Sequence, residues 1–362
     1  MGNRVGLGTV IGFWQNECSF ASRDNQLPKQ IIEQFERLIR RDPANRGLIA
    51  GEEVHGPLCA GHLTEAAFHL AEHATHVVLL TGFYVPHGQP PAAETDGPPG
   101  TLMLARALES LGVEVTVLTD ELCFPAVQAA ATATGFDAES LVVFPHESHS
   151  WLPDFFEIGR GRSLTHLISV ERPGPSHTLE SLPQQRRTAE PPLDHFSGLV
   201  PAASQNRCHN MRGRPIDEHT AETYRLFDQL LKYRPDAKTI GIGDGGNEIG
   251  MGAIPWEELH RRLDGEQAAR IPCRIATDWT IVAGVSNWGA YALAAAVLLA
   301  RNDVEFLRDW DADRELSIIT QIVKHGPAVD GITARAEPTV DGLPFETYIQ
   351  PWSGIRRLLR FE

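Results

Sequence analysis

The sequence predicts a Rossmann-like α/β fold in three layers, in which a mostly parallel sheet carries helices on both faces. Short, nearly continuous apolar runs recur along the chain, and such runs are typical of strands buried on both faces. Segments with apolar residues at helical spacing alternate with these runs, which gives the strand–helix–strand order of a βαβ unit. Hydrophobic residues make up 42% of the 362 residues, enough for a large core.

The first half of the chain supplies most of this alternation. Residues 28–41 have apolar residues at helical spacing until the segment DPANRGL breaks the pattern. Residues 75–83, THVVLLTGF, form the first buried run, and a helical segment separates it from the next run, VEVTVL. In order, we expect helices at 28–41 and 63–74, a strand at 75–83, a helix at 101–111, a strand at 113–118, a helix at 125–134, and strands at 140–145 and 164–170.

The second half continues the alternation after an interruption. Residues 172–205 are rich in proline and polar residues, and a loop this long is either a functional lid or a passive insertion. We divide the chain into an N-terminal extension with a helix (1–40), an α/β domain (41–345) that includes this Pro-rich insertion, and a C-terminal segment (346–362). After the insertion we expect a helix at 217–233, strands at 237–243, 273–278 and 280–285, and a helix at 287–301.

Composition narrows the class of protein. The formal net charge of -15 argues against a general nucleic-acid or anionic-membrane surface, although a local basic pocket is compatible with it. Five scattered cysteines without a CxxC pair suit a reducing compartment. The start of the chain does not read as a secretory signal, and the longest apolar stretch, residues 290–300, is too short to span a bilayer. We therefore expect a cytoplasmic protein without nucleic-acid or membrane partners, and the sequence is compatible with a homo-oligomer.

Acidic and polar residues follow nearly every predicted strand at its carboxyl end. Because the carboxyl ends of parallel strands meet at one edge of a sheet, these side chains should gather at one site. One acidic strand end would be ordinary helix capping, whereas five or more indicate an acidic binding site. The residues concerned are Glu94, Asp96, Asp120, Glu171, Arg172, Asp244, Asp278, Ser286 and Asn287.

The segment ETDGPPG, residues 94–100, precedes a predicted helix. The N–H groups at the start of a helix attract anions, so Asp96 could serve only to cap that helix. Glu94 and the Gly-Pro-Pro-Gly sequence exceed what capping needs, and a functional role is the favoured interpretation.

The segment GIGDGGNEIGMG, residues 241–252, matches the G-x-G-x-x-G pattern of dinucleotide-binding proteins. Two further glycines and a proline prevent a helix from starting promptly, and Asp244 would place negative charge in the phosphate site, so nucleotide binding is disfavoured. The favoured hypothesis is that Asp244, Asn247 and Glu248 face one small polar molecule, as general bases or as oxygen ligands of Mg²⁺ or Mn²⁺. A turn held only by Asx hydrogen bonds is the alternative.

Taken together, these segments resemble the D-glutamate cyclase-like domain family, which forms the C-terminal half of the mitochondrial D-glutamate cyclase of animals. The resemblance runs in order over roughly residues 40–345, and the family usually has a shorter connection where this chain has its Pro-rich insertion. ETDGPPG and GDGGNEIGMG are its most specific parts. The other matching segments are DPANRGL, TGF, Thr119-Asp120, ERPG, NMRGRPI, VSNWGAYAL, VDGIT and VDGL.

The resemblance implies a hydro-lyase that converts D-glutamate to 5-oxo-D-proline and water. On this hypothesis Asp244 or Glu248 is the base and Asn247 orients the substrate. Glu94, Asp96 and Asp120 would hold a divalent cation or the substrate ammonium group. The remaining candidates would bind the amino-acid substrate, with the arginines on its α-carboxylate and the last two as donors at a helix N-terminus; they are Glu171, Arg172, Arg212, Ser286 and Asn287.

Two other functions remain open at this point. One is a metal-dependent hydrolase or lyase that acts on another small carboxylate. The other is a non-catalytic amino-acid-binding module. The sequence contains neither a GxSxG elbow nor a Walker loop, so acyl-serine chemistry and P-loop ATP use have no support.

Overall fold

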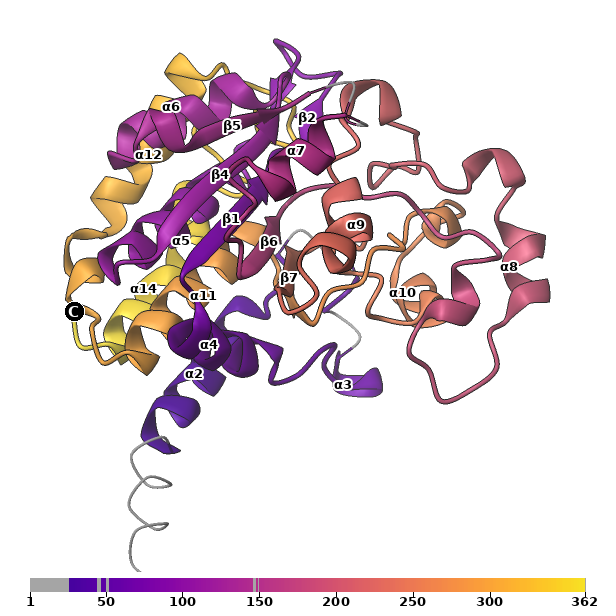
Figure 1. Cartoon of the computed structure of the whole chain (residues 1–362), viewed down its shortest axis with the longest axis horizontal. Helices are drawn as coiled ribbons and strands as arrows, with labels where there is room; N and C mark the ends of the chain where they lie inside the picture. Colours follow the sequence, from indigo (N-terminus) through magenta and orange to yellow (C-terminus); the bar gives the residue numbers. More distant parts are fainter. Residues whose placement is uncertain (1–25, 44–46, 50–51, 146–147, 149, 362) are drawn as a thin grey trace, which may run out of the picture.

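The computed structural model describes residues 26–43, 47–49, 52–145, 148 and 150–361, and a six-stranded sheet forms its centre (Figure 1). The strand order is β5-β4-β1-β6-β7-β8, and every neighbouring pair is parallel. Counted along the chain without the short hairpin strands, this is the doubly wound order 3-2-1-4-5-6 of Rossmann folds. The strands are β1 His76–Thr81, β4 Glu114–Asp120, β5 Leu141–Phe144, β6 His166–Val170, β7 Lys238–Gly243 and β8 Trp279–Val282.

Strand β1 shows why helices cover both faces of the sheet. Its side chains alternate, so that Val77 and Leu79 pack into one hydrophobic cluster while Val78 and Leu80 pack into another. All six residues of the strand are buried. A strand that is apolar on both sides can be buried only between two layers of helices. The predicted three-layer α/β fold is therefore confirmed.

The two helical layers differ in size. The larger layer packs on the cluster that contains Val77, and the smaller layer packs on the cluster that contains Val78 (Figure 1). The larger layer contains α2 Gln26–Ile39, α4 His62–His73, α5 Pro98–Ser110, α6 Phe124–Thr134, α11 Ser286–Ala300, α12 Ala312–His325 and α14 Gln350–Leu358. The smaller layer contains α7 Trp151–Glu157, α9 Arg225–Tyr233 and α10 Trp256–Arg262.

Both predicted end segments contribute to the main core. Phe35 of α2 and Trp352 of α14 belong to the same buried cluster as the first strand and α11. The short helix α13, Phe345–Tyr348, places Tyr348 in that cluster as well. Residues 1–25 of the predicted N-terminal extension lie outside the described residues.

Part of the helix predicted at 217–233 is replaced by irregular chain. Only its second half is α-helical, as α9, while Asp217–His219 form a 3-10 turn. The chain between them is held from outside, because the Arg172 side chain donates to the Ala221 carbonyl and to the Thr223 hydroxyl. In a continuous helix the Ala221 carbonyl would point along the helix axis toward an N–H group of the next turn, and not toward Arg172.

The strand predicted at 273–278 is absent from the sheet. Cys273 and Ala276 form only isolated bridges, to Ser176 and to the glycine-rich loop at 250–251. Asp278 consequently lies beside the start of β7, where its carboxylate accepts hydrogen bonds from Thr239. This position is at the amino ends of the strands, away from the acidic site predicted at their carboxyl ends.

The Pro-rich segment 172–205 is folded onto the side of the domain. It contains the short helix α8, Leu193–Leu199, flanked by 3-10 turns at Leu182–Gln184 and Ala202–Ser204. Leu182 and Phe196 pack on Trp256 of α10 in a separate hydrophobic cluster. Its buried anchor residues explain how a segment without regular periodicity is ordered.

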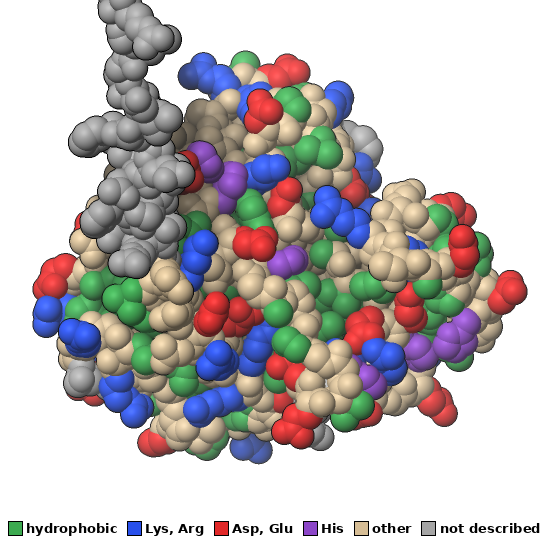
Figure 2. Space-filling model, turned by 90° about the horizontal axis from the view of Figure 1, so that it is seen from below, with side chains coloured by type: hydrophobic (Ala, Val, Ile, Leu, Met, Phe, Trp, Pro, Cys, Tyr) green, Lys and Arg blue, Asp and Glu red, His purple; other side chains and the backbone are tan. Residues whose placement is uncertain are grey.

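The surface mixes charges of both signs. On the face seen in Figure 2, basic and acidic side chains lie interspersed, and neither sign forms a continuous patch. Within the part of the chain that the structure describes, none of the helices combines the length and the apolar character that a membrane crossing requires.

Candidate functional site

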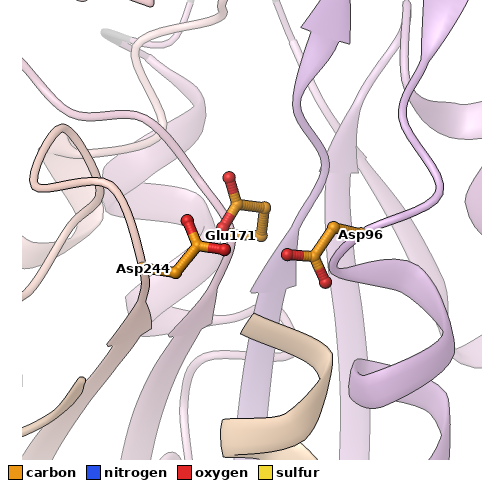
Figure 3. A group of neighbouring side chains, drawn as sticks. All are labelled: Asp96, Glu171 and Asp244. Atoms are coloured by element: carbon orange, nitrogen blue, oxygen red, sulfur yellow. The ribbon is translucent and has the colours of Figure 1, made fainter. Parts of the chain in front are cut away.

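Three buried carboxylates converge where the strand order reverses, between β1 and β6. Asp96 lies just before α5, Glu171 directly follows β6, and Asp244 directly follows β7. Their side chains point toward one another (Figure 3), and one oxygen from each lies within 4.8 Å of the others. The reversal point at the carboxyl ends of the strands is where doubly wound sheets bind ligands. We refer to Asp96, Glu171 and Asp244 as the acidic cluster.

Backbone amides from two helix starts hold Asp96. One carboxylate oxygen accepts the N–H groups of Gly97 (3.0 Å) and Asn287 (2.8 Å), and the other accepts the N–H of Ser286 (2.9 Å). Asp96 thus caps α11, not the helix that follows it in the sequence. The cap therefore lies on another helix than the one expected from the sequence, and Asp96 also belongs to the acidic cluster.

Glu171 occupies a strained and electrostatically unfavourable position. Its φ of 47° lies in the left-handed region, which residues with a side chain rarely adopt. The Ser286 hydroxyl donates to its carboxylate at 2.5 Å. Burial, and then the neighbouring carboxylates, of which Asp244 and Glu248 come first, raise the pKa of Glu171 well above its usual value. The folded structure therefore favours the protonated form of this group, and a cation bound beside it would oppose that preference.

The glycine-rich loop 241–252 turns around the side chain of Glu248. The Glu248 carboxylate accepts the N–H groups of Asp244 (3.3 Å), Gly245 (2.7 Å) and Gly246 (2.7 Å). Gly246 has a φ of 99°, which only glycine adopts readily. The Glu248 side chain therefore holds the loop in its turn.

Asn247 is anchored on one side and unpaired on the other. Its Nδ2 donates to the carbonyl of His209 at 2.8 Å, which fixes the orientation of the amide. Its Oδ1 is buried and has no hydrogen-bond partner among the described residues. The amide thus leaves a buried acceptor beside the cavity, as expected for a residue that binds a ligand donor.

A cavity of about 240 Å³ lies over the acidic cluster and gathers most of the predicted site residues. Ligand pockets for drug-sized molecules usually have about 300–1,000 Å³, so this cavity suits a small metabolite. Of the described residues of the Pro-rich segment, none beyond Arg172 lines this cavity, which favours the passive-insertion alternative over the lid. The predicted residues in the lining are Glu94, Glu171, Arg212, Asp244, Asn247 and Glu248.

Arg172 and Asp120 pair with each other away from this lining. Arg172 Nη2 lies 2.5 Å from Asp120 Oδ2, and its other donors reach the carbonyls of Gly82 and Ala221 and the hydroxyl of Thr223. Burial alone would raise the pKa of Asp120, but the adjacent guanidinium lowers it overall. Both side chains are buried, and the donors of Arg172 are engaged within the protein. The geometry thus favours a structural role for this pair over the predicted contacts with substrate or metal.

Asn287 also serves the structure of the site. Its Oδ1 accepts the N–H groups of Gly97 (3.0 Å) and Gly100 (2.8 Å), and its Nδ2 donates to the Thr95 carbonyl (3.2 Å). These bonds join the starts of α5 and α11. Asn287 is therefore placed beside the cluster, as predicted, but its donors and acceptors are directed at the protein.

The structure adds cavity residues that the sequence did not single out as a site. Asp341, with a φ of 55°, and Ile332 line the cavity from the VDGL and VDGIT segments, which read as ordinary turns. His87 lines it from the loop after β2 Tyr84–Val85, and partial burial followed by Arg212 and Arg214 lowers the pKa of this histidine. For Asp341 and Ile332, the sequence contained one indication of a role in the site, the resemblance of VDGL and VDGIT to motifs of the family.

The arrangement can bind positive charge at its floor and negative charge at its wall. Three carboxylates this close repel one another when all are ionised. Either one of them keeps a proton or a cation balances their charge. Carboxylate oxygens suit hard cations such as Mg²⁺ and Mn²⁺, and they also suit an ammonium group. Of the predicted metal ligands Glu94, Asp96 and Asp120, only Asp96 belongs to the cluster, which Glu171 and Asp244 complete.

Two comparisons with known proteins identify the family of the chain. A family model described as D-glutamate cyclase-like, C-terminal, matches residues 35–181 and 176–355. A human protein with the name D-glutamate cyclase, mitochondrial, is 28% identical over 272 residues, which cover 75% of this chain and 39% of that protein. The match thus spans about two fifths of the human relative.

Proposed function

Because the chain belongs to the D-glutamate cyclase-like family, we propose that it is a lyase that converts D-glutamate to 5-oxo-D-proline and water. The observation that carries this proposal is the buried acidic cluster under a cavity of about 240 Å³ with an arginine in its wall. An amino acid with one ammonium group and two carboxylates complements such a distribution of charge. The human relative that bears the cyclase name supports the choice of substrate.

The reaction is a ring closure with loss of water. The amino nitrogen attacks the side-chain carboxyl carbon, a C–N bond forms, and one C–O bond of that carboxyl group breaks. The two hydrogens that the ammonium group loses leave with the oxygen as water, so the net charge of the organic molecule is unchanged. Holding nitrogen and carbon together in the right orientation can supply about 7 to 11 kcal/mol of the barrier.

Asp244 is the favoured base for the first proton. Glu248, the other predicted base, already accepts three backbone N–H groups and holds the loop. Asp244 lines the cavity and belongs to the cluster, where an ammonium group would be attracted. The amide of Asn247, with its unpaired Oδ1, would accept an N–H of the same nitrogen.

Arg212 is the favoured partner of the substrate α-carboxylate. It lines the cavity and is exposed, whereas Arg172 is engaged with Asp120. With the ammonium group toward the acidic cluster and the α-carboxylate toward Arg212, the substrate side chain would fold back so that its carboxyl carbon reaches the amino nitrogen beside the same cluster. A guanidinium binds a carboxylate through two parallel hydrogen bonds, which would fix this orientation.

We further propose that the acidic cluster holds a divalent cation. Asp96, Glu171 and Asp244 supply only carboxylate oxygens, the donor set of Mg²⁺ and Mn²⁺. A cation bound there would polarise the side-chain carboxyl group and stabilise charge that develops on its oxygen. Each carboxylate has two oxygens, so Asp244 could contact a cation and still accept a proton.

Proton NMR of D-glutamate and L-glutamate with the purified protein tests the proposal. Mn²⁺ broadens proton signals, so each incubation contains Mg²⁺ or a chelator. We expect 5-oxoproline from the D isomer with Mg²⁺ and much less in the chelator. The Asp244→Asn variant should fold normally and lose turnover by about 100-fold or more, the usual contribution of a positioned base.

Other outcomes would favour the alternatives. Tight binding of D-glutamate or 5-oxoproline without turnover would indicate a non-catalytic amino-acid-binding module. Metal-dependent turnover of another small carboxylate would indicate a related hydrolase or lyase. The predicted cytoplasmic location stays a proposal, since the name of the human relative assigns that protein to mitochondria, and fluorescence imaging of a tagged full-length chain would test it.

A further inference from the structure

A single buried carboxylate, Asp330, joins the two turns that form one wall of the cavity. Its Oδ1 accepts the N–H groups of Ile332 (2.9 Å) and Thr333 (2.8 Å), and its Oδ2 accepts the N–H of Gly342 (2.8 Å). The side chain is fully buried and is not itself part of the cavity lining. One side chain behind the wall thus connects the VDGIT segment to the VDGL segment.

The turn in the VDGL segment presents Asp341 to the cavity. The Leu343 N–H donates to the Val340 carbonyl at 2.9 Å and closes the turn. Asp341 and Gly342 have φ values of 55° and 71°, and positive φ at both central residues is typical of a type I′ turn. The closing hydrogen bond does not use the N–H of Gly342, and Asp330 accepts it instead. Asp330 therefore holds this turn from behind, while the Asp341 side chain lines the cavity.

The turn in the VDGIT segment supports two further lining residues. Ile332 lines the cavity from this turn, and its side chain packs beside Gly342 of the other turn. Gly331 approaches Glu94 so closely that a Cβ at this position would lie 2.0 Å from Glu94 Oε2. The places of Glu94, Ile332 and Asp341 in the wall therefore depend on the two turns that Asp330 joins.

The Asp341 carboxylate has a chemical use that the mechanism above leaves open. An ammonium group has three N–H donors. The proposed mechanism directs two of them to Asp244 and Asn247, and Asp341 supplies a cavity acceptor for the third. The carboxylate is only 3% exposed, so a ligand in the cavity would remove its remaining contact with water. A carboxylate covered in this way requires a donor from the ligand.

We propose that Asp341 contacts the substrate and accepts an N–H of its ammonium group, and that Asp330 is a positioning residue that holds Asp341 in place. The inference rests on the proposed function for the identity of the ligand. It extends the binding site from the acidic cluster to a wall built by a distant part of the chain, and it gives a buried carboxylate outside the cavity a role in substrate binding.

The Asp341→Asn variant tests the contact with the substrate. Asn-Gly is a preferred pair in type I′ turns, so this variant should fold and melt as the wild type does. It removes the charge that attracts the ammonium group, and we expect KM for D-glutamate to rise about 10-fold. The nitrogen is neutral when it attacks, so kcat should change less than about 3-fold. An unchanged KM would overturn the contact.

The Asp330→Asn variant tests the positioning role. A carboxamide has one oxygen where Asp330 uses two, and we expect this oxygen to stay with the N–H groups of the nearer turn. Amide hydrogen exchange in the peptide 340–344 should then be about 10-fold faster than in the wild type, and KM should rise about 10-fold. Asp311→Ala is the matched control, because it leaves the Arg314 N–H at the start of α12 without its carboxylate acceptor. It should lower the melting temperature to a similar degree and leave KM unchanged.

The double variant Asp330→Asn/Asp341→Asn separates positioning from a general loss of structure. If Asp330 acts through Asp341, KM of the double variant should equal that of Asp341→Asn alone. Multiplication of the two single effects, or unchanged exchange of the peptide 340–344 in Asp330→Asn, would overturn the positioning role. If the wild type binds D-glutamate without turnover, the proposed reaction fails, and dissociation constants from calorimetry replace KM in the same comparison. A wild type that neither binds nor converts D-glutamate would overturn the ammonium contact together with the proposed function.

Discussion

The electrostatic position of Glu171 leads to a quantitative prediction for stability as a function of pH. Burial and the nearby carboxylates raise the pKa of Glu171 in the folded protein well above the value of 4.5 expected for the unfolded chain. Between these two values the folded state binds one proton that the unfolded state has lost. The stabilisation is therefore complete below about pH 4.5 and is lost as the pH rises through the folded pKa.

The magnitude follows from proton linkage. One proton of difference changes the free energy of unfolding by about 1.4 kcal/mol per pH unit, so a rise of two pH units within this range costs about 2.7 kcal/mol. The Glu171→Gln variant resembles the protonated acid in shape and retains a group for the Ser286 hydroxyl, but it cannot ionise. Its free energy of unfolding should not contain this slope.

Urea denaturation of both proteins in the presence of a chelator, at several pH values from 5 to 8, measures the effect. Buried histidines such as His166 and His177, whose pKa is lowered to about 3, give stability the opposite dependence on pH, because they must stay neutral when folded. These contributions are the same in both proteins and cancel in the difference. The wild type should lose stability relative to Glu171→Gln as the pH rises, and saturating Mg²⁺ should reduce this loss. Parallel curves would refute the reasoning.

Three substitutions separate the roles of other residues. Arg212→Gln should raise KM for D-glutamate roughly 10-fold to 100-fold in steady-state assays, because a charged hydrogen bond contributes about 1.5 to 3 kcal/mol, while kcat changes little; an unchanged KM would exclude the carboxylate contact. Asp120→Asn should lower the free energy of unfolding by about 3 to 5 kcal/mol in urea, because it leaves a buried guanidinium unpaired; a loss of kcat at full stability would instead indicate a catalytic role. Gly331→Ala places a methyl group 2.0 Å from Glu94 Oε2 and should lower kcat about 100-fold by displacing that carboxylate; wild-type kcat would show that Glu94 is dispensable.

The sequence was sufficient for the architecture because its strongest signals are local. A strand such as β1, with four consecutive apolar residues at its centre, has to lie between two helical layers, whatever its neighbours are. The position of Asp244 directly after the predicted strand likewise predicted its place at the carboxyl edge of the sheet, next to β7. Where the apolar pattern was weak, as at 273–278, the prediction of a strand was wrong, and Asp278 moved to the opposite edge of the sheet with it.

Pairings between distant segments could not be read from the sequence. The neighbouring sequence does not distinguish Arg172, which is engaged with Asp120, from Arg212, which lines the cavity. Both arginines lie in segments that match family motifs, ERPG and NMRGRPI. Asp341 was overlooked because an Asp-Gly turn is common, and its carboxylate reaches the cavity only through tertiary packing. Tyr348 lies in a segment that reads as a separate end of the chain, and only packing brings it into the main core.

The left-handed backbone of Glu171 has a consequence for engineering. Glycine or asparagine would adopt its φ of 47° at lower conformational cost, and neither would add a carboxylate to a crowded acidic cluster. A library selected only for resistance to heat should therefore be enriched in replacements at this position. We expect variants selected in this way to be more stable but inactive in the proposed reaction. Directed evolution of this chain therefore has to select for product formation and heat resistance together.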